Sequence, residues 1–258
     1  MAYTRQTFLA NSAFRFDTIL GILDTCLKVF IFWCIYRALY GVNGSVDGIT
    51  FEMVTTNFIL SIGLSAAFTM DENYLPYRIG NGSIGNELLK PASVRGILLA
   101  SDLGSICFKL LFCFLPALAL AAAVIGMMGP VSLEALPAFL ISVALGFLVL
   151  WNLNFIVQTF GFWIINVWSI NTIKNVMVNV LSGTMIPVWF LPSWMEGVIN
   201  LTPFSAIYFT PIQIYLGNVT GIQILGLLIK QGIWIAILYL IGEILWRQGV
   251  RKLVIQGG

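Results

Sequence analysis

Six long runs of apolar residues constrain the fold of this chain more than any other feature. They cover about residues 19–40, 51–70, 100–126, 135–158, 174–191 and 222–246. An α-helix needs about 20 mostly apolar residues to cross the hydrocarbon core of a bilayer. Only 9% of the residues are charged, whereas about 25% are charged in a typical soluble domain. The sequence therefore predicts an all-α polytopic membrane protein, with six transmembrane helices in one domain over residues 1–258.

Positively charged residues gather on one side of the predicted membrane helices. With a cytoplasmic N-terminus, the outer loops carry acidic residues and no Lys or Arg. Cytoplasmic loops of membrane proteins are enriched in Lys and Arg. Both termini are therefore predicted to be cytoplasmic. The residues placed on that side are Arg5, Arg15, Arg78, Lys90, Arg95, Lys174, Arg247, Arg251 and Lys252.

Two segments outside the apolar runs have their own predicted structure. Residues 7–18 mix aromatic and charged side chains, which is typical of an amphipathic helix on the membrane surface. Residues 192–216 are apolar but are interrupted by prolines, so short helices that re-enter the outer leaflet are expected before the last span. The residues that mark this outer segment are Pro192, Trp194, Pro203 and Pro211.

The longest predicted cytoplasmic loop covers residues 71–99. Its Gly80–Gly85 stretch matches GxGxxG, but it lies between membrane spans rather than in the βαβ unit of a nucleotide site. Ser83 is instead predicted to cap a short helix through Leu89 or Lys90, which Pro91 would end. An ordinary ordered loop is the alternative. In the helical interpretation, the side chains of Glu87, Leu88 and Lys90 are available for docking.

An asparagine stripe lies in the fifth predicted span. Asn171, Asn175 and Asn179 are four residues apart, so they share one helix face. That face either lines a polar pathway or makes hydrogen bonds between helices, and the sequence leaves both open.

Charged residues within the other spans are expected to pair locally. Asp24 is four residues from Lys28, and Glu243 is four residues from Arg247. Asp102 and Lys109 share a face of the third span, and Lys230 has no local partner. Such charges mark functional sites unless opposite charges neutralise them.

The composition argues against catalysis by this chain. It has no histidine, and its four cysteines lie inside apolar runs without a CxxC pair. A nucleophile–base pair or a metal site would need other ligands, and the carboxylates are scattered over both membrane faces. We therefore expect no cofactor, no metal and no nucleic acid on this chain.

Three segments resemble a known family in their residues, order and placement. They are Gly82-Ser83-Ile84-Gly85-Asn86-Glu87-Leu88-Leu89-Lys90-Pro91-Ala92-Ser93, Phe162-Trp163, and Ser182-Gly183 with Ile186-Pro187, Leu191-Pro192, Pro203-Phe204 and Pro211. Together they resemble permease subunits of the second class of ABC exporters, which have six spans per subunit.

The resemblance implies partners that the chain does not contain. ATP and Mg would bind a separate ATPase subunit, and a second permease subunit, identical or homologous, would complete the path through the bilayer of a bacterial cell. The substrate would be a drug, lipid, peptide or lipid-linked glycan. A secondary transporter or membrane scaffold is the alternative. The residues implied to dock on the ATPase are Ser83, Asn86, Glu87, Leu88, Leu89, Lys90 and Pro91.

Overall fold

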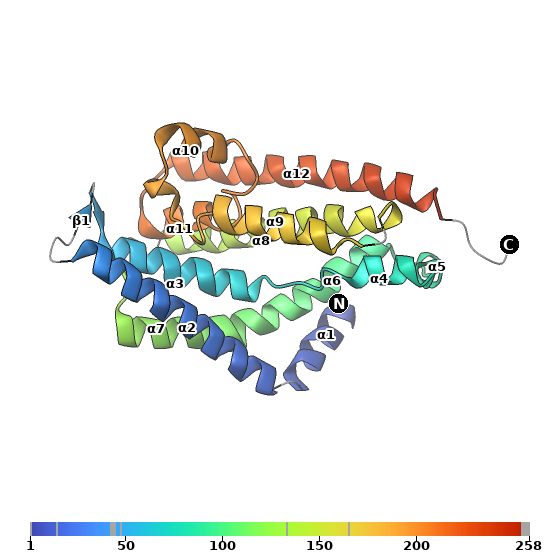
Figure 1. The fold of residues 1–258 in the computed structure, drawn as a ribbon, viewed down its shortest axis with the longest axis horizontal. Helices are drawn as coiled ribbons and strands as arrows, with labels where there is room; N and C mark the ends of the chain where they lie inside the picture. Colours follow the sequence, from blue (N-terminus) through green and yellow to red (C-terminus); the bar gives the residue numbers. More distant parts are fainter. Residues whose placement is uncertain are drawn as a thin grey trace.

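The computed structural model describes residues 2–13, 15–41, 45–46, 48–132, 134–164 and 166–253. Its elements are almost all helical (Figure 1). They are α1 (Ala2–Ala13), α2 (Arg15–Tyr40), β1 (Ser45–Val46), β2 (Ile49–Thr50), α3 (Phe51–Ala67), α4 (Tyr74–Gly80), α5 (Ile84–Leu88), α6 (Val94–Lys109), the π-helix η1 (Leu110–Phe114), α7 (Leu115–Ile125), α8 (Ala135–Thr159), η2 (Phe160–Phe162), α9 (Trp168–Leu181), η3 (Val188–Phe190), α10 (Ser193–Asn200), α11 (Phe209–Leu216) and α12 (Ile222–Val250).

Four described helices are long and apolar enough to cross a membrane. They cover Phe16–Tyr40, Val94–Ile125, Ala135–Phe162 and Ile222–Val250. The apolar helix α3 is shorter, at 17 residues. The chain is therefore an all-α membrane protein, and these helices agree with the predicted spans at 19–40, 100–126, 135–158 and 222–246.

The boundaries predicted for the fifth span are wrong. The helix expected over 174–191 is α9, which has 14 residues and ends at Leu181. Gly183 follows with a positive φ of 82°, a left-handed conformation that stops the helix. At 1.5 Å per residue, α9 is about 21 Å long, which is shorter than the bilayer core of about 30 Å.

The long helices lie side by side around a buried centre (Figure 1). Helix α8 packs most extensively against α12 and also contacts α11, while α2 packs on α3. Gln231 of α12 is fully buried and donates hydrogen bonds to the carbonyls of Ser142 (3.0 Å) and Ala206 (2.8 Å). This side chain ties α12 to α8 and to the segment before α11.

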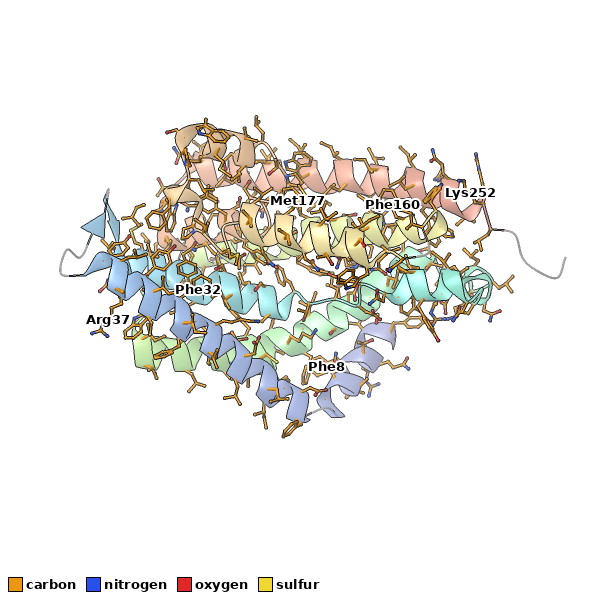
Figure 2. The ribbon with its side chains drawn as sticks, viewed as in Figure 1. Phe8, Phe32, Arg37, Phe160, Met177 and Lys252 are labelled. Atoms are coloured by element: carbon orange, nitrogen blue, oxygen red, sulfur yellow. The ribbon has the colours of Figure 1, made fainter. Side chains whose placement is uncertain are left out.

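The amphipathic helix predicted over residues 7–18 is split in two. Helix α1 ends at Ala13, and α2 begins at Arg15 and continues into the first span. Helix α1 packs against α6, where a Cβ atom on Gly104 would collide with the Thr4 carbonyl. Phe8 meets Phe108 edge-on, with ring centroids 5.5 Å apart (Figure 2). Helix α1 is therefore docked on the helical bundle.

The third span contains a π-helical turn at Leu110–Phe114. Pro116 lies at the start of α7 and cannot donate the backbone hydrogen bond that a regular α-helix requires. Such a loss is a common cause of irregular helical turns. The wider turn lies directly after Lys109, a residue considered below.

The proline-rich outer segment forms two short helices rather than one continuous helix. Pro192 precedes α10, Pro203 lies in the turns between the helices, and Pro211 lies in α11. Each helix has 8 residues, or about 12 Å, so neither can cross the bilayer core alone. Every residue of α11 is buried, whereas Trp194 on α10 is 72% exposed.

The two ends of the molecule carry different elements (Figure 1). We call them the α5 end and the β1 end. Arg37 lies near the β1 end of α2, and Lys252 lies at the opposite end, where its ammonium is 5.5 Å from the Trp163 ring centroid (Figure 2). Tyr3 of α1 lines a small cavity with Tyr74 and Lys90. Both described chain ends therefore lie toward α4 and α5.

Candidate functional site

The segment predicted to dock on an ATPase contains the short helix α5, as expected. Ser83 occupies its N-cap position, but its side chain makes no capping hydrogen bond. The predicted cap is therefore wrong. Ser83 has a helical backbone conformation, and its N–H group donates to Asn81 Oδ1 (3.0 Å). The helix ends at Leu88, one or two residues short of the predicted end at Leu89 or Lys90.

Glu87 is buried beneath α5 rather than exposed for docking. Its side chain is 3% exposed. The guanidinium of Arg78 on α4 donates to Glu87 Oε1 (2.7 Å), and the ammonium of Lys90 donates to both carboxylate oxygens (2.9 and 2.8 Å). The expectation that Glu87 is available to a partner is wrong, because both of its oxygens already hold cations from this chain.

The outward surface of α5 is apolar at its centre. Leu88 is 39% exposed and Leu89 is 85% exposed. Asn86 and Pro91 are also exposed, and Ser83 is half-buried. We call these two leucines with Asn86 and Pro91 the α5 surface.

Two groups near Glu87 have raised pKa values. The hydrogen bond from Lys90 to Glu87 raises the pKa of Lys90 above its ordinary value of 10.5. Burial, and then the negative charge of Glu87, raise the pKa of Tyr74 above its ordinary value of 10.0. The Tyr74 ring also lies 4.5 Å from the Arg78 guanidinium. At neutral pH these groups retain the protons that the folded arrangement requires.

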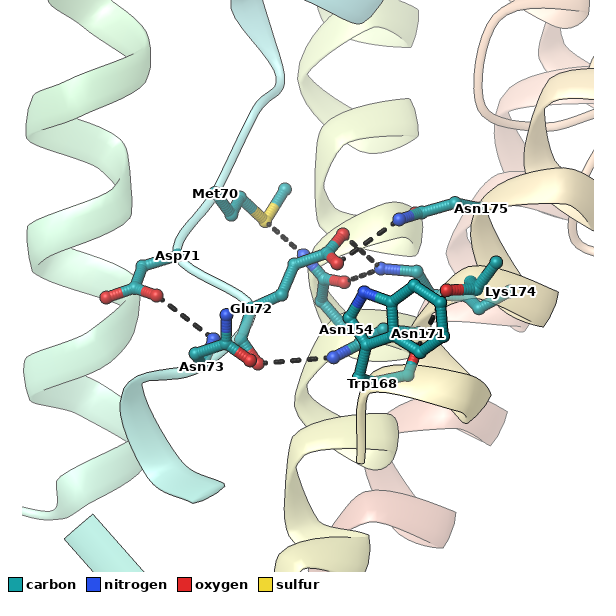
Figure 3. Close-up of polar contacts among 10 residues, drawn as sticks. Met70, Asp71, Glu72, Asn73, Asn154, Trp168, Asn171, Lys174 and Asn175 are labelled. Atoms are coloured by element: carbon teal, nitrogen blue, oxygen red, sulfur yellow. Dashed lines mark hydrogen bonds and ion pairs between the residues drawn. The ribbon is translucent and has the colours of Figure 1, made fainter. Parts of the chain in front are cut away.

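A second polar cluster joins the α3–α4 connection to α8 and α9 (Figure 3). Lys174 is buried, forms an ion pair with Glu72 (2.8 Å) and donates a hydrogen bond to Asn154 Oδ1. The asparagine stripe contributes as well: Asn171 donates to the Glu72 carbonyl (3.4 Å), and Asn175 donates to Glu72 Oε2 (3.2 Å). Two of the three predicted asparagines therefore make hydrogen bonds to another segment.

A cavity of about 540 Å³ adjoins this cluster. Its walls come from helices α2, α3, α6, α8 and α9 and from η1. The segment after α3 and the segment before α11 complete them. Asn175 and Asn179 line the cavity, whereas Asn171 is absent from its lining and is 3% exposed. Asn171 therefore makes the hydrogen bond between segments that one interpretation predicts, and Asn179 lines a cavity.

The predicted local charge pairs form only in part. Asp24 and Lys28 pair at 2.6 Å, as predicted. Among the described residues, Asp102 and Lys109 do not form an ion pair, because each has found another partner. Asp102 accepts from Trp151 Nε1 (2.9 Å), and Lys109 donates to Thr69.

At the last helix, Glu243 and Arg247 pair at 2.7 Å, as predicted. Lys230 was expected to have no local partner along its helix, and its ammonium lies 3.4 Å from Ser205 Oγ on another segment. Its contact is therefore tertiary.

Sequence reasoning missed three residues of these clusters. Glu72, Asn154 and buried Arg95 make contacts with segments 20 to 144 residues away in the chain. Arg95 donates to Asn152 Oδ1 (2.6 Å) and to the Tyr239 carbonyl (3.1 Å). The available signal was Lys174, the one charged residue of α9, which needs an acidic partner elsewhere.

The outer segment lies at the β1 end, away from α5 (Figure 1). Pro192 and Trp194 belong to the start of α10. Pro203 lies in the turns before α11, and Pro211 is a buried residue of α11. Tyr215 of α11 donates to the Met128 carbonyl (3.1 Å), which fixes α11 against the segment after α7. Of the predicted outer residues, Pro211 is therefore buried in the packed part and Pro203 is half-buried, whereas Pro192 and Trp194 are exposed.

Comparison with known proteins agrees with the predicted resemblance. A family model described as ABC-2 family transporter protein matches residues 22–257. A search of curated proteins found no match. The match covers the spanning helices, α4 and α5, and the outer segment. The chain therefore belongs to the ABC-2 family of transporter proteins, as an integral membrane permease of an ABC transporter.

Proposed function

We propose that this chain is the membrane subunit of an ATP-driven exporter and that a separate ATPase chain docks on the α5 surface. The observation that carries this proposal is the geometry of α5. Two leucines are exposed, Leu88 as the last residue of α5 and Leu89 directly after it, and the underside of α5 is fixed by the buried ion pairs of Glu87. An apolar centre beside exposed polar groups is the usual composition of a small protein interface.

Attachment of α5 to α4 would allow a force on α5 to reach the spanning helices. Arg78 connects the two short helices through Glu87. Helix α4 packs against α8 and η2, and Leu75 donates its N–H to Gln158 of α8 (3.1 Å). A displacement of the α5 surface is therefore transmitted through ion pairs and a buried hydrogen bond to α8.

The proposal includes the orientation, the assembly and the cargo. Both chain ends and α5 are cytoplasmic. This orientation agrees with the predicted excess of Lys and Arg on one side of the membrane and with the position of both described chain ends near α4 and α5. A second permease subunit, identical or homologous, completes the path in a bacterial membrane. ATP and Mg bind to the ATPase subunits. The cargo is hydrophobic or amphipathic, and α10 and α11 form a re-entrant cap on the exit side.

Replacement of Leu89 by Asp tests the docking site. A carboxylate at the centre of an apolar interface loses its water without gaining a partner, so binding of the ATPase should weaken by about 2 kcal/mol or more. Leu89→Met preserves an apolar side chain and is the matched control. Ser132→Asp, at the far end of the molecule, controls for effects of a new charge on folding.

The measurement is co-purification of the ATPase with each variant, followed by ATP-dependent transport in vesicles. We expect Leu89→Asp to lose both, while Leu89→Met and Ser132→Asp retain them. Full retention of the ATPase and of transport by Leu89→Asp would contradict docking on the α5 surface. Transport that continues without any ATPase would instead favour a secondary transporter.

A further inference from the structure

On α8 and α9 the cavity lining changes from polar to apolar with distance from α5, and Asn179 adds one polar group at the far end of the α9 wall. On α8, Asn154 lines it nearer the α5 end and Leu150 lies one turn farther away; on α9, Lys174 and Val178 have the same relation. On α3, Ile62 continues the apolar wall. A volume of about 540 Å³ is typical of sites for drug-sized ligands, which cover about 300–1,000 Å³. The lining is therefore amphipathic at the scale of one molecule.

Most charges in the cavity are neutralised within the chain. Lys28 pairs with Asp24 on the same helix, and Lys174 pairs with Glu72. Asn154 and Asn175 add hydrogen bonds to the second pair. These two pairs have no net charge to offer a ligand.

Lys109 is different, because its hydrogen-bond partners are neutral. Its ammonium donates to the Thr69 carbonyl (2.9 Å) and to Thr69 Oγ1 (2.7 Å). Within the part of the chain that the structure describes, no carboxylate lies at ion-pair distance from it. An ammonium has three protons to donate, so the two bonds to Thr69 leave one. Asp102 acts on Lys109 only from a distance, because its carboxylate bonds to Trp151 instead. A cation inside a membrane helix without a direct ion pair is costly, and an anion would compensate it.

The cavity can be reached past α2. The Asp24 and Lys28 side chains border it and are 56% and 55% exposed. Asp17 lies on the same helix at the same cavity and is also exposed. An entering molecule would therefore pass between charged groups before it meets Lys109 and the apolar wall.

We propose that this cavity, within a single subunit, binds one amphiphile whose anionic end, a phosphate or a carboxylate, contacts Lys109. The apolar part of the molecule packs against Ile62, Leu150 and Val178. The inference rests on the proposed transport function, since it names the class of cargo. It assigns Lys109 as the residue that selects the charge of the polar end.

Cys113 provides a reporter inside the cavity. It lies one turn beyond Lys109 and lines the same space. A variant that keeps Cys113 and replaces the other three cysteines by Ala is assembled with the ATPase in phosphatidylcholine nanodiscs without ATP. The rate of maleimide labelling is measured with dodecyl phosphate and with dodecyltrimethylammonium, which share a chain and differ in charge. Dodecyl phosphate should slow labelling, and the cationic probe should not.

Substitutions at Lys109 separate ligand binding from a structural role. Lys109→Met should raise the dodecyl phosphate concentration needed for protection about tenfold or more. Lys109→Arg should retain protection. Lys230→Met, which removes a lysine outside the cavity, is the matched control and should behave as the parent. A merely structural role for Lys109 would change stability without changing the preference between the two probes.

Two further thiol reporters complete the labelling experiment. If Cys113 labels poorly, a Ser65→Cys variant without Cys113 places a thiol at another position of the cavity lining. A variant that keeps only Cys34, an exposed thiol that is absent from the cavity lining, should label at the same rate with either probe.

The possible results distinguish failure of the cavity proposal from failure of the proposed transport function. Absent protection, equal protection by both probes, or unchanged protection in Lys109→Met would overturn the cavity proposal. If the ATPase still co-purifies in those samples, the proposed function stands. If protection follows the prediction while no ATPase binds, the binding site stands and ATP coupling fails.

Discussion

The buried carboxylate of Glu87 allows a quantitative test of how α5 is held. In Glu87→Gln the side chain keeps its size but loses the charge that binds Arg78 and Lys90. The 2.7 Å bond to Arg78 is charge-assisted and its acceptor is buried, but the Arg78 side chain is 32% exposed and can be rehydrated. We therefore take a value of about 2 kcal/mol for this bond, within the range for hydrogen bonds to charged groups.

A loss of about 2 kcal/mol raises an opening equilibrium about thirtyfold. Hydrogen exchange at the α5 amides reports this opening, because local units of a protein open with their own free energies. The assay is exchange followed by mass spectrometry on peptides that cover residues 84–90, in nanodiscs. Peptides from α8 and α12 should be unchanged, since Glu87 makes no described hydrogen bond or ion pair with those helices.

Two matched variants distinguish the buried contact from a general charge effect. Lys90→Met removes the exposed member of the group and should change α5 exchange much less than Glu87→Gln. Glu52→Gln removes an exposed carboxylate at the β1 end and should change nothing at α5. Exchange of α5 in Glu87→Gln that equals the parent protein would refute the inference that this carboxylate anchors the helix.

Three further predictions follow from buried or close contacts. Gln231→Leu leaves the Ala206 carbonyl without this donor and the buried Ser142 hydroxyl without its acceptor, and should lower the free energy of unfolding by about 2–4 kcal/mol, measured by thermal unfolding in detergent. Gly104→Val should displace α1 and raise its hydrogen exchange, whereas Gly226→Val, whose new Cβ would meet no other group, should not. The raised pKa values of Tyr74 and Lys90 mean that their protonated forms stabilise the fold: this contribution is complete below about pH 10 and is lost as the pH rises through the folded values. Exchange at α5, corrected for intrinsic rates, should therefore stay constant from about pH 6 to 9 and increase at higher pH; a change within the neutral range would contradict this assignment.

Much of the helical plan could be predicted because hydropathy is a local property of the chain. The runs at 135–158 and 222–246 correspond closely to α8 and α12. The fifth span failed because its apolar run continues past Gly183, where the backbone turns. Apolar composition continues through such a turn, so hydropathy alone cannot locate the helix end.

The candidate sites were predictable in position but not in contacts. The loop with Leu88 and Leu89 was found from its place between two spans and from its sequence pattern. Its Glu87 was expected on the surface, and its burial depends on Arg78 of α4 approaching from nine residues away. The asparagine stripe was found from helical periodicity, but which of its members face the cavity depends on how α9 packs against α8.

The sequence by itself determined that this protein is helical, lies in a membrane, and carries a short helix between its second and third apolar runs, because each property depends on neighbouring residues. Local pairs such as Asp24–Lys28 could be predicted from helical spacing, but only the tertiary structure decided the partners of the other membrane charges. Asp102 and Lys109 share a helix face, yet they bond to Trp151 and Thr69 from other segments. Pairing of charges inside a membrane depends on which groups the packed helices bring within hydrogen-bond distance, and that distance is set by the whole bundle.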